Sequence, residues 1–69
     1  MNVVGPKVKE IREAQGITQE ELAARCNIFE WDISRGTLAK IEAQVRRVTD
    51  EEVSFLAKAL KVDINELYS

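Results

Sequence analysis

Residues 12–23 read REAQGITQEELA, and they contain the end of one predicted helix and the start of the next. Gly16 stands where glycine commonly ends a helix, because glycine adopts a positive φ without strain. Thr18 and Glu21 have the spacing of a capping box, in which the threonine oxygen and the glutamate carboxylate each accept a hydrogen bond from an unpaired backbone N–H. The stretch therefore predicts a helix boundary at Gly16 and a second helix that begins at Gln19.

Apolar residues recur at helical spacing in the rest of the chain as well. The predicted helices, with their apolar residues, are 4–15 (Val4, Val8, Ile11, Ala14), 19–29 (Leu22, Ala23, Cys26, Phe29), 34–44 (Leu38, Ile41, Val45), 50–60 (Val53, Leu56, Ala57, Leu60) and 64–68. Ser34, Thr49 and Asp63 stand at the starts of the last three helices as N-caps. We therefore predict an all-α fold of five helices, in a single domain that spans residues 1–69.

Composition excludes several classes of function. The chain has 69 residues, no histidine and a single cysteine, Cys26, whose place on an apolar stripe indicates a core residue rather than a metal ligand or reactive thiol. No apolar run approaches the roughly 20 residues that span a bilayer, and the first residues lack the apolar segment of a signal peptide. The acidic residues fall at helix starts and on solvent faces. We expect no enzyme activity, cofactor, metal, small-molecule ligand or membrane contact, and a cytoplasmic location.

Charge is unevenly distributed along the chain. The net charge is −2, which by itself disfavours binding to nucleic acid. Between Arg35 and Arg47, however, four basic residues stand against one acid, so this segment carries +3. The segment includes most of the third predicted helix, and it can turn one basic face towards DNA phosphates.

The connection between the second and third helices, residues 27–33, allows two interpretations. In the preferred one, Ile33 is the buried residue before the N-cap, and Phe29 and Trp31 close over the end of the second helix. In the other, Ile28 takes that place and residues 29–33 loop out. An interface role for Trp31 is the alternative to its covering the core.

Residues 12–67 resemble the Cro/repressor-like helix-turn-helix family, also called the XRE family. The matching segments are residues 12–23, residues 34–42 (SRGTLAKIE) and residues 56–62 (LAKALKV). The resemblance implies a lambda-repressor-like domain of five helices whose third helix enters the major groove of double-stranded DNA. Two features depart from the family: the connection between helices 2 and 3 is lengthened and lacks glycine, and Gln44 stands where glycine commonly follows helix 3. Because positive φ is strained for glutamine, the second departure favours a helix that continues by a turn.

The resemblance and the helical geometry together suggest roles for individual residues. Small and basic residues on the outer face of the third helix are expected to contact bases: Arg35, Gly36, Thr37, Ala39 and Lys40. Residues at helix ends and just beyond the third helix are expected to contact phosphates: Thr18, Gln19, Ser34, Gln44, Arg46 and Arg47. Arg12 and Glu42 match family positions that form a partly buried ion pair between helices 1 and 3.

These observations predict sequence-specific binding of duplex DNA by a transcriptional regulator of the repressor type, acting as a homodimer. Phe55 lies off the apolar stripe of its helix, so it either meets a second copy of the chain or covers the segment around Trp31. Val62 and Tyr68 are candidate neighbours in a dimer interface. The alternative function is a protein-interaction module, for example antitoxin-like or an assembly adaptor, that uses the same fold without DNA.

Overall fold

The computed structural model describes residues 4–68, and all regular structure in that range is helical. The five helices are α1 (Val4–Ala14), α2 (Gln19–Ile28), α3 (Arg35–Glu42), α4 (Asp50–Leu60) and α5 (Ile64–Tyr68). The predicted all-α fold of five helices is confirmed. The last two helices have the predicted bounds, α1 and α2 each end one residue earlier than predicted, and α3 is shorter at both ends.

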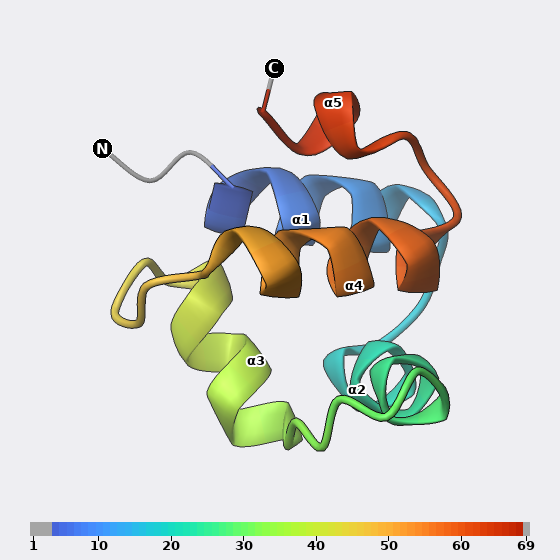
Figure 1. The fold of residues 1–69 in the computed structure, drawn as a ribbon, viewed down its shortest axis with the longest axis vertical. Coiled ribbons are helices and arrows are strands. Elements are labelled where there is room, and N and C mark those ends of the chain that lie inside the picture. The colour runs from blue at the N-terminus through green and yellow to red at the C-terminus, as the bar shows by residue number, and fades with distance from the viewer. Residues whose placement is uncertain (1–3, 69) are drawn as a thin grey trace.

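The helices are arranged around α1 and α4, which lie side by side (Figure 1). α5 packs against both of them on one side, while α2 and α3 lie on the other side and contact each other. One apolar cluster joins all five helices, and its largest fully buried members are Val8, Leu22, Cys26, Leu38, Ile41, Val53, Leu56, Leu60 and Leu67. Burial raises the pKa of the Cys26 thiol to about 11, so this cysteine is a protonated core residue at neutral pH.

Local capping explains where the helices begin. Both predicted capping boxes form: the Thr18 hydroxyl accepts from the Glu21 N–H at 3.1 Å, and the Thr49 hydroxyl accepts from the Glu52 N–H at 3.2 Å. Ser34 caps α3 by accepting from the backbone N–H of Thr37 at 3.2 Å. These bonds satisfy N–H groups that have no partner inside the helix, so the first turns of α2, α3 and α4 are well defined.

The end of α3 differs from the prediction. The helix stops at Glu42, and Gln44 adopts the left-handed conformation, with φ 64°, that we expected it to avoid. Two backbone hydrogen bonds hold it there, because the Gln44 N–H donates to Ile41 O at 3.1 Å and the Val45 N–H donates to Lys40 O at 2.9 Å. The helix therefore ends without glycine, and Val45, predicted to face the core, is 75% exposed.

The lengthened α2–α3 connection follows the preferred interpretation. Ile33 is 5% exposed and belongs to the core, whereas Ile28 is 77% exposed, so the placement based on Ile28 is wrong. Trp31 covers the core, and its ring stacks on Phe55 with the centroids 5.8 Å apart. Phe55 therefore covers the inserted segment, which is one of its two predicted roles, and its contact with a second copy of the chain stays a prediction. Two smaller predictions also fail, because Phe29 and Ala14 are exposed rather than buried on their helices' apolar stripes.

Gly5 brings α1 and α3 together more closely than the sequence predicts. It is buried in the first turn of α1, and a Cβ at this position would overlap the carbonyl oxygen of Ile41 at the end of α3. A glycine is therefore required here for the backbones to approach each other. This contact places the C-terminal half of α3 against α1 and leaves the opposite side of α3 free.

Candidate nucleic-acid interface

α3 buries one side and exposes the other. Leu38 and Ile41 are completely buried, so they anchor the helix to the core. The residues predicted to contact bases lie on the remaining surface: Arg35, Gly36 and Lys40 are exposed, and Thr37 and Ala39 are half-buried. The exposed side of α3 therefore carries two cations among residues with short side chains.

Gly36 has no neighbour that requires a glycine. A Cβ added at this position would have the Ser34 hydroxyl oxygen, 3.8 Å away, as its nearest atom within 4 Å. Its backbone is helical, with no positive φ. Gly36 differs in this respect from Gly5, which is in contact with another helix. The space above Gly36 is thus open to a molecule that approaches α3 from outside.

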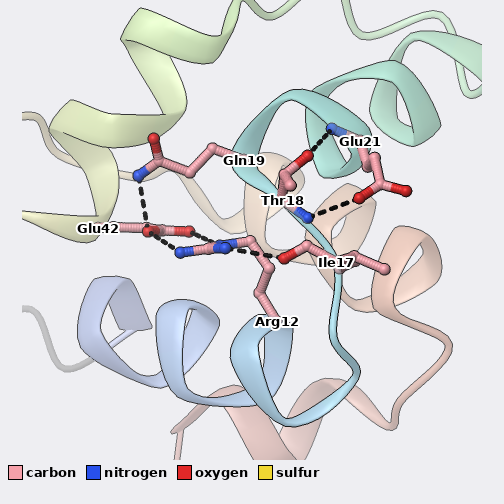
Figure 2. Close-up of polar contacts among 6 residues, drawn as sticks. All are labelled: Arg12, Ile17, Thr18, Gln19, Glu21 and Glu42. Atoms are coloured by element: carbon pink, nitrogen blue, oxygen red, sulfur yellow. Dashed lines mark hydrogen bonds and ion pairs between the residues drawn. The ribbon is translucent and has the colours of Figure 1, made fainter.

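A buried ion pair connects α3 to α1. Arg12 Nε donates to Glu42 Oε2 at 2.8 Å, and Arg12 Nη2 donates to Oε1 at 3.1 Å (Figure 2). The two residues are 8% and 6% exposed. The hydrogen bond with Glu42 raises the pKa of Arg12, so the guanidinium stays charged. The structure thus brings together the two residues that the family resemblance pairs.

The same carboxylate also holds the start of α2. Gln19 Nε2 donates to Glu42 Oε1 at 3.0 Å, and Arg12 Nη1 donates to the carbonyl oxygen of Ile17 at 2.8 Å (Figure 2). Sequence reasoning assigned Gln19 to phosphate and missed this contact with Glu42. One polar network therefore joins α1, α2 and α3, in addition to the apolar core that they share.

Thr18, Gln19 and Arg35 lie around a single open depression, together with Arg12 and Glu20. The depression lies between the N-terminal ends of α2 and α3, where unpaired N–H groups and the positive ends of two helix dipoles favour an anion. Glu20 is the one acid among its lining residues. The predicted phosphate contacts of α2 and the first cation of α3 are thus adjacent in space.

Arg46 is held by α4. Its Nη2 donates to Glu52 Oε2 at 2.8 Å, its Nη1 donates to Oε1 at 3.1 Å, and the same Nη1 donates to Arg47 O at 3.0 Å. Glu52 also accepts from the Thr49 N–H at 3.0 Å as part of the capping box. These contacts raise the pKa of Arg46 and lower that of Glu52, chiefly through the hydrogen bonds that join the two side chains. Arg46 therefore fixes the loop after α3 to the start of α4.

Three cations of this segment remain available to a ligand. Within residues 4–68 the side chains of Arg35, Lys40 and Arg47 form no ion pair or hydrogen bond, and all three are exposed. Gln44 is exposed in the turn between Lys40 and Arg47. The basic surface predicted from the sequence is thus formed by three unpaired cations, because Glu42 is neutralised by Arg12 and Arg46 by Glu52.

Comparison with protein families agrees with this geometry. A family model described as Helix-turn-helix matches residues 8–67, which include all of α2, α3 and α4. The chain belongs to this helix-turn-helix family. Searches of curated proteins and of solved structures found no match. This is a family of DNA-binding domains of the Cro/repressor-like type, so the general function of this helix-turn-helix domain is DNA binding in transcription regulation.

The described part of the helix-turn-helix domain has neither a candidate metal site nor a candidate membrane span. Residues 4–68 contain no group of three or more side chains that could hold a metal ion. None of the helices in that range is long and apolar enough to cross a membrane.

The residues predicted for a dimer interface of the helix-turn-helix domain are not equally available. Phe55 is half-buried under Trp31, and Val62 packs against the core. Tyr68 is 46% exposed, and its hydroxyl lies 3.4 Å from Asp50 Oδ1 at the start of α4. Of the three, Tyr68 offers the largest free surface.

The clamp between Arg46 and Glu52 predicts a pH dependence of stability. Because the folded-state pKa of Glu52 is lowered from its ordinary value of 4.5, its contribution is complete above that pH and is lost as the pH falls through the lowered value. Glu52→Gln keeps a side chain that can complete the capping box but removes the charge. In urea unfolding measured between neutral pH and pH 3, we expect the stability of Glu52→Gln to fall less steeply below pH 4.5 than that of the unchanged protein. Parallel curves would contradict this role of Glu52.

Proposed function

We propose that the domain binds double-stranded DNA sequence-specifically, with α3 in the major groove, and regulates transcription as a repressor-type homodimer in the cytoplasm. The observation that carries the proposal is the outer side of α3, where unpaired Arg35 and Lys40 flank a glycine with open space above it. The roughly 12 Å major groove admits a helix, and close approach of its backbone allows Arg and Lys to reach guanine acceptors.

In this proposal the residues around α3 face either base edges or phosphates, and Arg35 lies where the two sets meet. Arg35, Gly36, Thr37, Ala39 and Lys40 face the base edges. The depression lined by Thr18, Gln19 and Arg35 receives one phosphate, with Ser34 beside it, and phosphates near the other end of α3 lie against Gln44 and Arg47. Arg46 contributes indirectly, since its bonds to Glu52 position the loop that carries Arg47.

The experiment compares one residue of each group on a DNA site selected from a random pool. Lys40→Ala is expected to weaken binding to the best site by about 1–3 kcal/mol, with little effect on random DNA. Arg47→Ala is expected to weaken binding to all sequences alike and to lower the slope of log affinity against log salt by about one per subunit. Lys61→Ala, which removes an exposed cation at the far end of α4, is the matched control. It should change neither the affinity for DNA nor the slope of log affinity against log salt.

A protein-interaction module is the second candidate, and one observation favours it. Ile28 and Phe29 are exposed apolar residues in a groove that is also lined by Arg25, Lys58 and Lys61. If the unchanged protein binds no duplex at moderate salt, this groove becomes the better starting point for its function.

A further inference from the structure

α1, α2, α3 and α4 all end in the same hydrogen-bonded motif. In each, a residue just past the helix adopts the left-handed conformation, and the N–H of the residue after it donates to the carbonyl oxygen five residues earlier, a pattern known as the Schellman motif. The donors and acceptors are Ile17 to Arg12 O, Trp31 to Cys26 O, Val45 to Lys40 O and Val62 to Ala57 O. An apolar residue occupies the donor position in all four. The motif commonly packs this residue against the side chain of the acceptor residue, so the four pairs can be compared directly.

Three of the four pairs are directed inwards. Ile17, Trp31 and Val62 are partly buried and pack on the core. Their acceptor partners Arg12, Cys26 and Ala57 are buried as well. The end of α3 is different, because Val45 is 75% exposed and its partner Lys40 is also exposed. The same motif thus ends four helices. Its apolar residue is packed on the core in three of them and exposed to solvent in one, at the end of the proposed recognition helix.

We infer that Val45 makes an apolar contact with DNA beside the base pair approached by Lys40. The inference rests on the proposed function and extends it to a residue that the sequence pattern assigned to the core. The apolar groups that DNA presents there are the thymine methyl in the major groove and the edge of the deoxyribose. A valine has one strongly restricted side-chain torsion, so little conformational freedom is lost when such a contact forms.

Charge around Val45 favours DNA over a second copy of this chain as the partner. The neighbouring cations Lys40 and Arg47 are exposed and have no partner within residues 4–68. Two copies that met at this point would bring the same cations together, whereas phosphates would neutralise them. An exposed apolar side chain among unpaired cations is therefore suited to a polyanion that also carries apolar groups.

The test measures affinity of Val45→Ala for a selected DNA site. We expect binding about 3- to 10-fold weaker than that of the unchanged protein, because two methyl groups are lost from the contact. Ile28→Ala is the matched control, since Ile28 is 77% exposed on a different helix end, and its affinity for DNA should not change. Thermal unfolding should be nearly the same for Val45→Ala and the unchanged protein, because the side chain buries little surface in the protein itself.

A second arm replaces thymine by uracil at single positions of the site, which removes only the methyl group. If Val45 contacts a thymine methyl, uracil at one position per half-site will lower the affinity of the unchanged protein. The same uracil will not lower the affinity of Val45→Ala. If Val45→Ala weakens binding but no uracil position shows this coupling, the contact is with deoxyribose. Equal affinities of Val45→Ala, Ile28→Ala and the unchanged protein would overturn the inference while leaving the proposed function intact. A loss of self-association by Val45→Ala in sedimentation without DNA would assign Val45 to a protein contact and overturn it too.

Discussion

Replacing Arg12 by alanine is expected to lower the free energy of unfolding by about 3–5 kcal/mol, because the variant leaves a buried carboxylate without its counter-ion. Glu42 is 6% exposed and would keep one side-chain donor, Gln19, whose amide carries no charge. The start of α2 would also lose the bond from Arg12 to Ile17 O. Since small domains are stable by roughly 5–15 kcal/mol, with short chains near the lower limit, this loss is large enough to unfold much of the population.

Two control variants test whether the loss of stability in Arg12→Ala comes from the burial of the ion pair. Arg46→Ala breaks a pair of similar geometry whose arginine side chain is 37% exposed, so a loss of about 0–1 kcal/mol is expected. The double variant Arg12→Met, Glu42→Leu removes both charges and nearly keeps the volume, so it should be more stable than Arg12→Ala. Urea unfolding of the four proteins tests both expectations. An unchanged melting temperature for Arg12→Ala would show that the pair does not stabilise the fold.

Local signals in the sequence were sufficient for most of the fold. The capping boxes at Thr18 and Thr49 and the glycine at position 16 act within a few residues, so the helix boundaries that depend on them were predictable. The contact of Gly5 with Ile41 was not, because it joins residues far apart in the sequence. The left-handed conformations of Glu30 and Gln44 were not predictable either, because backbone hydrogen bonds hold them against the preference of these residues.

The candidate site was predictable only where a residue's exposure follows from the apolar pattern of its own helix. The exposed residues of α3 follow from its apolar stripe, since burial of Leu38 and Ile41 decides which side is free. The prediction that Val45 faces the core was wrong because it continued the apolar period of α3 beyond Glu42, where the helix ends. The partners of Gln19 and Arg46 depend on how helices and loops meet in space. For Arg46, the one available signal was an acid at the start of the next helix.

Replacing Gly36 by glutamate is expected to reduce specific DNA binding by about 100-fold or more without unfolding the protein. The added carboxylate would stand on the outer side of α3, where like-charge repulsion from phosphates costs several kcal/mol and each 1.4 kcal/mol is tenfold in affinity. Within the protein the position is open, because Ser34 Oγ, at 3.8 Å from an added Cβ, is the nearest atom within 4 Å. Glutamate is also a better helix former than glycine, so the melting temperature should stay the same or rise.

Two variants at the same position separate bulk from charge. Gly36→Gln adds nearly the same volume without the charge, so its affinity should lie between those of Gly36→Glu and the unchanged protein. Gly36→Ala adds a single methyl group and should raise stability by about 0.5–1 kcal/mol while weakening DNA binding, a combination that packing within the protein cannot produce. Affinity is measured on the selected site at moderate salt, and stability by thermal unfolding of the same samples. If Gly36→Glu binds that site as tightly as the unchanged protein, α3 does not enter the groove with this side facing the bases.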